Sequence, residues 1–229
     1  MKDYLASNKD YWEKGYTAPN VESFVFRFYG RVLKPEFDLG RGYENLVDFG
    51  CGQGATVNFF TKQGFNARGV DISRTDIEIA KIRYPHLATH FDVCDPDPSN
   101  NDFYGFPKDV SVVTAIQSLY YFSNTDFDIC MEKIHRSMRK GGVFYATMMG
   151  VGQKQFFNNS EEYQDGLRRV SFKTSRYEVK DYYISFTNDK SHLLERFKMF
   201  KPVHIGFYAQ KFREDEEEGF HYTFCGIKE

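Results

Sequence analysis

The stretch that decides the fold is LVDFGCGQG, residues 46–54. Its first half is a short apolar run around Asp48, and its second half places glycines at the alternate positions Gly50, Gly52 and Gly54. The residues that follow have the character of a helix start. A strand, a tight glycine-rich turn and a helix make up the first half of a nucleotide-binding βαβ unit. Glycine lets the strand turn sharply, and the helix N-terminus offers unpaired N–H groups to a ligand.

A second strand, residues 67–70, ends in Asp71, whose carboxylate could accept both hydroxyls of a ribose. The Gly-x-Gly-x-Gly spacing differs from the Gly-x-Gly-x-x-Gly of dinucleotide sites. Asp48 stands two residues before the first glycine, where a carboxylate suits a cationic ligand better than a pyrophosphate. Together these features favour a site for a cationic ligand.

With the segment GVDIS at residues 69–73, the glycine turn resembles the motifs of the class I S-adenosylmethionine-dependent methyltransferases. The resemblance extends from about residue 46 to residue 147, and it includes a helix, a Gly141-Gly142 turn and a strand near its end. It implies an α/β fold with a Rossmann-like, doubly wound sheet of seven strands, mostly parallel with the last strand antiparallel. It also implies an N-terminal helical cap and an insertion after strand five.

The length suits one methyltransferase domain over residues 1–229. We expect four parts within it: a helical cap (1–34), a cofactor-binding core (45–148), a candidate substrate lid (150–187), and a C-terminal helix with a strand pair (188–229).

Three local features can be checked against the structure. The apolar spacing predicts a helix over residues 21–33, with a polar loop following it over 35–45. Asn124 is expected to cap the helix before strand five. Residues 181–187 are expected to form an exposed strand.

The resemblance also implies how S-adenosylmethionine is held. The glycine turn contributes backbone contacts, Asp48 orients N–H groups or meets the amino end, and Asp71 takes the ribose hydroxyls. An acidic residue after strand three reads the adenine amine; Asp95 is the better match and Asp92 the alternative, and a plain turn carboxylate is also open. The cofactor-binding residues implied are Asp48, Gly50, Cys51, Gly52, Gly54, Asp71, Ile72, Asp95, Gln117 and Ser118.

Four side chains are candidates for the acceptor side of the site. Tyr120 and Tyr121 follow the fourth strand, at the sheet edge where ligands bind in open α/β folds; aromatic packing against the next helix is the alternative for each. Arg27 and Arg31 are four apart on one helix face and could grip a carboxylate, or could form a solvated basic edge.

The composition indicates which binding partners and which cellular compartment to expect. A formal net charge of −2 argues against a nucleic-acid binder, which would normally carry a basic stripe. The four cysteines form no C-x-x-C pair, so we expect no zinc site or disulfide framework, and a reducing cytoplasm fits. No apolar run approaches the roughly 20 residues that span a bilayer, so no membrane attachment is expected. Aromatic residues make up 18% of the chain and supply either an aromatic core or a pocket lining.

The sequence therefore predicts transfer of a methyl group from S-adenosylmethionine to an oxygen or nitrogen of a small metabolite or saccharide precursor. S-adenosylhomocysteine is the product, and the two arginines hint at an anionic acceptor. No catalytic base is identified by spacing, and the oligomeric state is not predicted. Two alternatives are an NAD(P)-dependent Rossmann oxidoreductase, which the glycine spacing disfavours, and a non-catalytic S-adenosylmethionine-binding partner protein.

Overall fold

The glycine turn joins strand β1 (Asn45–Phe49) to helix α4 (Ala55–Lys62), as the sequence predicts. The computed structural model describes residues 2–14, 20–40, 42, 44–100, 107–174 and 178–229. Gly54 is the N-cap of α4 and has a φ of 80°, a left-handed conformation that favours glycine. A Cβ at this position would lie 2.6 Å from the ring of Phe91, so the close approach of helix and sheet also requires glycine.

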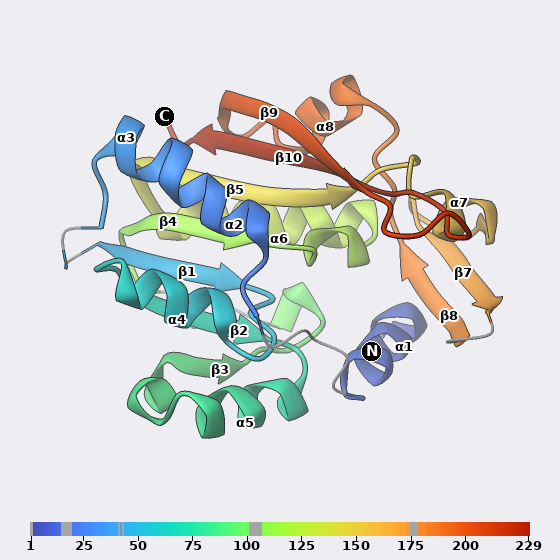
Figure 1. Cartoon of the computed structure of the whole chain (residues 1–229), viewed down its shortest axis with the longest axis horizontal. Coiled ribbons are helices and arrows are strands. Elements are labelled where there is room, and N and C mark those ends of the chain that lie inside the picture. Colours follow the sequence, from blue (N-terminus) through green and yellow to red (C-terminus); the bar gives the residue numbers. More distant parts are fainter. Residues whose placement is uncertain (1, 15–19, 41, 43, 101–106, 175–177) are drawn as a thin grey trace.

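A seven-stranded sheet forms the centre of the fold, in the order β3-β2-β1-β4-β5-β10-β9 (Figure 1). Strands β1 to β5 are parallel, whereas β10 runs antiparallel to both β5 and β9. This arrangement confirms the predicted Rossmann-like sheet with a reversed last strand. The strands besides β1 are β2 (Asn66–Asp71), β3 (Phe91–Val93), β4 (Val110–Ala115), β5 (Met138–Met149), β9 (Lys201–Gln210) and β10 (Gly219–Ile227).

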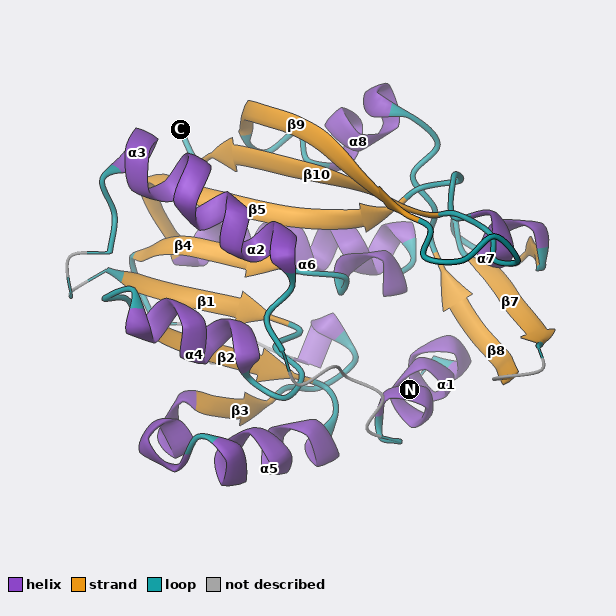
Figure 2. Cartoon of the chain, in the orientation of Figure 1, coloured by secondary structure: helices purple, strands orange, loops and turns teal. Residues whose placement is uncertain are grey.

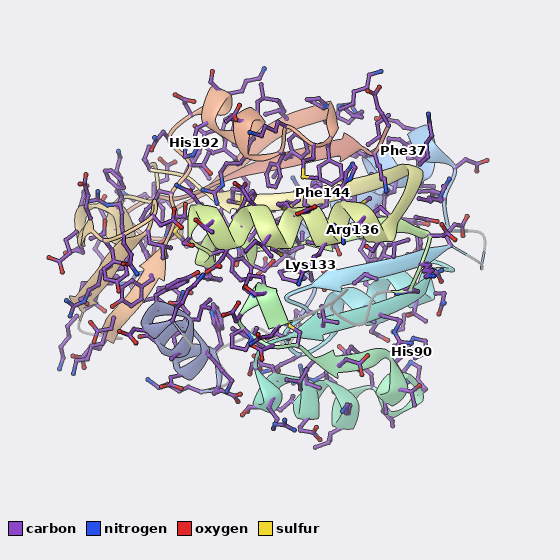
Figure 3. The ribbon with its side chains drawn as sticks, turned by 180° about the vertical axis from the view of Figure 1, so that it is seen from behind. Phe37, His90, Lys133, Arg136, Phe144 and His192 are labelled. Atoms are coloured by element: carbon purple, nitrogen blue, oxygen red, sulfur yellow. The ribbon has the colours of Figure 1, made fainter. Side chains whose placement is uncertain are left out.

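Helices cover both faces of the sheet (Figure 2). Successive side chains of β5 belong to two different apolar clusters: Phe144 faces α6 and α8, and Tyr145 faces α2 and α4. Seen from behind, α6 lies along the sheet and carries Lys133 and Arg136 (Figure 3). The helices that pack on the sheet include α2 (Ser23–Phe28), α5 (Arg74–Arg83), α6 (Asn124–Ser137) and α8 (Lys190–Arg196). Short 3₁₀ turns occur at Pro85–His90, Pro98–Asn100 and Leu119–Tyr121.

The insertion after β5 forms a second, antiparallel sheet in the order β6-β7-β8. It begins with α7 (Lys154–Asn158), and its strands are β6 (Ser160–Glu162), β7 (Arg168–Lys173) and β8 (Glu178–Ile184). Figure 1 shows this small sheet beside α1, beyond the arrowheads of the central strands. The insertion therefore lies at the edge where the carboxyl ends of the parallel strands meet.

Helix α1 (Asp3–Trp12) is fixed between the small sheet and α5. The Asn8 side chain donates to the carbonyl oxygen of Tyr183 (3.0 Å) and accepts from its backbone N–H (2.9 Å). Glu13, just after α1, accepts hydrogen bonds from two backbone N–H groups at the N-terminus of α5, at 3.0 and 3.1 Å. Although burial acts to raise it, these bonds and one from the Thr75 hydroxyl lower the pKa of Glu13 to about 2.

Three local expectations were wrong. The helix does not stop at residue 33: a π-helical turn (Tyr29–Leu33) leads into α3 (Lys34–Phe37). Pro35 lies in the first turn of α3, where its missing N–H breaks no bond.

The other two errors concern an N-cap and a strand. Ser123 caps α6 in place of Asn124, because its hydroxyl accepts from the Asp126 N–H. Strand β8 ends at Ile184, and its last residues are buried because α1 covers them.

Gly54→Ala should lower the free energy of unfolding by about 2–4 kcal/mol, because it adds left-handed strain and a clash with buried Phe91. A thermal melt should show a midpoint lower by about 4–16 °C. Gly30→Ala is the control, since an added Cβ meets nothing within 4 Å and should change stability by less than about 1 kcal/mol. Equal shifts for both variants would contradict the packing described.

Candidate active site

A cavity of about 300 Å³ opens at the carboxyl ends of β1, β2, β3 and β4, with α1 on its far side. Its walls come from α1, the segment before α2, the glycine turn, the ends of β2 and β3, and the loop after β4. The described residues that line it are Leu5, Asn8, Trp12, Asn20, Glu22, Asp48, Phe49, Gly50, Cys51, Gly52, Ala55, Thr56, Asp71, Ile72, Asp76, Cys94, Pro96, Ile116, Gln117, Ser118, Tyr121 and Phe122.

Hydrogen bonds connect the glycine turn to β2 and to the loop after β4. The N–H groups of Gly50 and Cys51 donate to the carbonyl oxygen of Val70, at 2.8 and 3.1 Å. Ser118, from the loop after β4, donates its hydroxyl to the carbonyl oxygen of Phe49 at 2.8 Å. A Cβ on Gly50 would lie 2.4 Å from the Ser118 Cβ, so this contact between the two loops requires glycine.

Asp71 ends β2 with its carboxylate fixed by two backbone donors. The Gly52 N–H donates to Oδ2 and the Ser73 N–H to Oδ1, both at 2.8 Å. Burial raises the pKa of Asp71 to about 6, although these two hydrogen bonds act to lower it. Each carboxylate oxygen keeps a lone pair that a ligand hydroxyl can use.

Asp48 lies beneath the turn and is only 1% exposed. Its Oδ1 accepts a hydrogen bond of 2.6 Å from the Thr114 hydroxyl. Burial raises the pKa of Asp48 to about 7, and the charge of Asp71 acts in the same direction. A cation bound nearby would favour the charged form of this carboxyl group.

The charges on the cavity wall are of one sign. Glu22 and Asp76 join Asp48 and Asp71 there, and no lysine or arginine occurs among the described lining residues. Asp76 accepts a hydrogen bond of 3.1 Å from the side chain of Gln53. Four carboxyl groups with no lining cation give a site that suits a cationic ligand.

One wall of the cavity is aromatic. The rings of Trp12 and Tyr121 meet edge to face with centroids 5.6 Å apart. The Tyr121 hydroxyl donates to the Tyr120 hydroxyl at 3.3 Å, and the Tyr121 ring also packs against Tyr182 of the small sheet. The cap and the insertion therefore meet at this wall.

Gln117 links the cavity to a polar cluster behind it. Its backbone has a φ of 52°, which is uncommon outside glycine, and its N–H donates to the Thr147 hydroxyl at 2.8 Å. Its side chain donates to the Tyr208 hydroxyl at 2.9 Å, and the Tyr208 ring stacks on His221. Burial lowers the pKa of His221 to about 4, and its Nε2 has no hydrogen-bond partner among the described residues.

Most of the residues expected to bind the cofactor line this cavity: Asp48, Gly50, Cys51, Gly52, Asp71, Ile72, Gln117 and Ser118. Gly54 and Asp95 do not. Gly54 packs between helix and sheet, and Asp95 accepts from Asp97 N–H and Asn100 Nδ2 in its own turn. The neighbours of Asp95, Cys94 and Pro96, reach the cavity instead.

Of the four residues predicted for the acceptor side, one lines the cavity and three do not. Tyr121 lines the cavity, whereas Tyr120 is 2% exposed and lies behind it. Arg27 and Arg31 are exposed on the cap helix and do not line the cavity.

Sequence reasoning missed several lining residues, notably Asn8, Trp12, Glu22 and Asp76. For Asp76 there was a signal: it stands three residues after the N-cap Ser73, so it faces the strand ends at the first turn of α5. The others come from segments whose position depends on tertiary packing.

The chain matches a known protein family. A family model described as a methyltransferase domain matches residues 21–199, most of the chain. The chain belongs to the methyltransferase domain family. A curated relative, an uncharacterized methyltransferase from Bacillus mycoides (strain KBAB4), is 21% identical over 179 residues, covering 71% of this chain and 80% of the relative.

Solved structures of methyltransferases share the fold. An S-adenosylmethionine-dependent methyltransferase from Clostridium acetobutylicum aligns with a TM-score of 0.66 at 14% identity, covering 96% of this chain and 97% of that one. Magnesium protoporphyrin IX methyltransferase from Synechocystis, with bound S-adenosylhomocysteine, aligns with a TM-score of 0.64 at 12% identity, covering 99% and 100%.

The family match makes this chain a methyltransferase, and therefore an enzyme. The oxidoreductase alternative and the non-catalytic alternative are not supported. Within the described part of the chain, no helix is long and apolar enough to cross a membrane.

Asp71→Ala should weaken the binding of S-adenosylhomocysteine by about 1.5–3 kcal/mol, the range for a hydrogen bond to a charged group. Titration calorimetry measures this directly. Asp92→Ala is the matched control, because Asp92 is an exposed carboxylate near the end of β3 that pairs with Arg68 and lies outside the cavity lining. Unchanged affinity in Asp71→Ala would remove Asp71 from the binding site.

The affinity for S-adenosylmethionine should rise by up to about tenfold between pH 6 and pH 8, because Asp48, with a pKa of about 7, becomes charged across this range. Asp48→Asn should flatten the profile. The raised pKa also means that the folded protein binds more protons than the unfolded chain between pH 4 and pH 7. The free energy of unfolding should therefore fall as pH rises through that range. Calorimetry at several pH values checks the affinities, and an equally steep profile in Asp48→Asn would contradict the assignment.

Proposed function

We propose that this methyltransferase transfers the methyl group of S-adenosylmethionine to an oxygen or nitrogen atom of a small organic acceptor. The observation that carries the proposal is the cavity itself, whose lining combines four carboxyl groups with the aromatic side chains of Trp12 and Tyr121. Its volume of about 300 Å³ is in the range of small-molecule sites. A net charge of −2 and the acidic lining also favour a small molecule over a nucleic acid.

In this proposal, the cofactor lies across the strand ends. Its methionine portion lies over Gly50, Cys51 and Gly52, its ribose hydroxyls bond to Asp71, and Ile72 packs on the adenine ring. Two observations support this pose: the Asp71 carboxylate is pre-oriented with lone pairs to spare, and Gly50, Cys51, Gly52 and Ile72 line the same cavity. Asp95 does not line the cavity, and its oxygens each accept one hydrogen bond within its own turn, so it would reach the adenine amine only if that turn moved.

The acceptor would lie against Trp12 and Tyr121. We propose that it is uncharged or cationic, because four carboxyl groups and no described lysine or arginine line the cavity. An anionic acceptor would lose hydration and gain no compensating cation there. In the sequence, Arg27 and Arg31 suggested an anionic acceptor. Both side chains are exposed and neither lines the cavity, so they do not support that suggestion.

The bound cofactor supplies an activated sulfonium, so the task of the protein is to position the acceptor. The acceptor lone pair forms a bond to the methyl carbon as the carbon–sulfur bond breaks, and sulfur keeps that electron pair. A hydroxyl or amine acceptor would then release its proton to solvent water. Trp12 and Tyr121 would hold the acceptor in line, and α1 would help to exclude water from the reacting atoms.

Four free, buried cysteines support a reducing compartment such as the cytoplasm.

A radiolabelled methyl-transfer assay tests the acceptor class. Three para-substituted phenols with short side chains differ in charge: tyramine is cationic, 2-(4-hydroxyphenyl)ethanol is neutral and 4-hydroxyphenylacetate is anionic. They would be run beside pooled neutral, cationic and anionic metabolites. Labelled product in the neutral or cationic sets supports the proposal, whereas transfer only to anions or only to macromolecules overturns it.

Tyr121→Ala should lower methyl transfer to such an acceptor by at least about tenfold, since the acceptor would lose an aromatic wall worth about 1.5–3 kcal/mol. The affinity for S-adenosylhomocysteine should change by less than about threefold. Phe26→Ala, at an exposed site on α2, controls for the loss of an aromatic side chain elsewhere. A parallel loss of cofactor binding would instead place Tyr121 on the cofactor side.

A further inference from the structure

We propose that Glu22 holds the methyl acceptor through a positively charged amino group on that acceptor. The inference rests on the proposed function, because it names one chemical group of the small molecule that the cavity would bind. It narrows the acceptor from an uncharged or cationic molecule to one that carries an ammonium group. A protonated amine has no free lone pair, so the methylated atom is a second oxygen or nitrogen of the same molecule.

Glu22 differs from the other acidic residues of the cavity in having a side chain that the protein leaves unbonded. Asp48, Asp71 and Asp76 each accept a hydrogen bond from another part of the chain. Glu22 occupies the N-cap position of α2, but its side chain makes no capping hydrogen bond. It lines the cavity and is partly buried, yet it forms no hydrogen bond or ion pair with any residue that the structure describes. Its carboxylate is therefore available to a ligand.

The location of Glu22 separates it from the proposed ribose position. Phe24, two residues later, stacks on Tyr208 of β9 with ring centroids 4.4 Å apart. Burial raises the pKa of the Tyr208 hydroxyl, and the negative charge of Glu22 acts in the same direction, so these two groups are close. Asp71 ends β2, and β1, β4, β5 and β10 lie between β2 and β9 in the sheet. Within the proposal, a cofactor whose ribose lies at Asp71 leaves the Glu22 side to the acceptor.

The aromatic wall of the cavity is continuous with the ring beside Glu22. Ring contacts connect Tyr208 to His221, His221 to Tyr120 and Tyr120 to Tyr121, with centroids 5.1, 5.7 and 4.5 Å apart. Tyr121 and Glu22 both line the cavity, one from the loop after β4 and the other from the segment before α2. An acceptor whose flat body packs on Tyr121 can extend its amino group toward Glu22.

Gln117 supplies a second hydrogen-bond acceptor near this carboxylate. Its Nε2 donates to the Tyr208 hydroxyl at 2.9 Å, the same hydroxyl that the charge of Glu22 influences. With the amide nitrogen bonded to β9, the Gln117 Oε1 remains for a ligand, and no described residue donates to it. A primary ammonium has three N–H donors and can use the carboxylate and the amide oxygen together, whereas a hydroxyl has one donor. The pair therefore selects an ammonium over an alcohol, and in this proposal Gln117 contacts the acceptor rather than the cofactor.

Binding to the protein saturated with S-adenosylhomocysteine tests the inference without methyl transfer. The probes are amines paired with alcohols of the same skeleton: tyramine with 2-(4-hydroxyphenyl)ethanol, tryptamine with 2-(indol-3-yl)ethanol, and 2-phenylethylamine with 2-phenylethanol. In ligand-observed NMR titrations near neutral pH, at least one amine should bind at least about tenfold more tightly than its alcohol, the effect of a hydrogen bond to a charged group. Glu22→Gln keeps the size of the side chain and removes its charge, so it should reduce this preference to less than about threefold.

Two controls accompany the titrations. The affinity of Glu22→Gln for S-adenosylhomocysteine should stay within about threefold of the wild-type value, because Glu22 lies away from the proposed cofactor contacts. Glu78→Gln is the matched variant, since Glu78 is an exposed carboxylate on α5 that pairs with Lys81 and does not line the cavity. This variant should retain the full preference for amines.

Three results would overturn the inference: no amine preferred over its alcohol in the wild-type chain, an unchanged preference in Glu22→Gln, or an equal loss of S-adenosylhomocysteine affinity in that variant. The last result would assign Glu22 to the amino group of the cofactor. The proposed function has a separate test, since labelled product from neutral or cationic acceptors supports it whatever the outcome for Glu22.

Discussion

The carboxylate of Asp71 is held by the N–H groups of Gly52 and Ser73, and these two hydrogen bonds connect three elements of the fold. They join the glycine turn after β1 to the end of β2 and to the start of α5. The turn must hold its left-handed glycine conformation for Gly52 to reach Asp71, and α5 must begin at Ser73 for the second donor to be available. The position of the cavity depends on these two bonds.

Keeping acidic groups in this place has an electrostatic cost. Burial raises the pKa of both Asp48 and Asp71, which means that the protein surroundings disfavour their charged forms. A ligand with a positive sulfonium and a positive amino group relieves that cost by bringing the missing opposite charge. In the proposed pose, the binding of S-adenosylmethionine and the ionisation of these two carboxyl groups are therefore coupled.

The sheet and half of the cavity could be predicted from the sequence because they depend on local signals. A strand, alternate glycines and a helix start identify Asp48, Gly50 and Gly52, and the end of the next strand identifies Asp71. The acceptor side depends on contacts between distant segments. Arg27 and Arg31 share a helix face, but the four-residue spacing does not say whether that face meets the cavity. Trp12 lines it because Asn8 ties α1 to the small sheet and Glu13 ties it to α5.

The small sheet has a consequence for how such an enzyme can change. Its three strands pair with one another and with no described strand of the main sheet. The segment could thus be lengthened, shortened or exchanged without opening the hydrogen-bond ladder that supports the glycine turn. Only the exposed part of the small sheet is free to change, because Val170, Tyr182 and Ile184 are buried in the same apolar cluster as the main sheet. For protein engineering, residues 150–187 are the natural place to graft a different loop and redirect the enzyme toward a new acceptor.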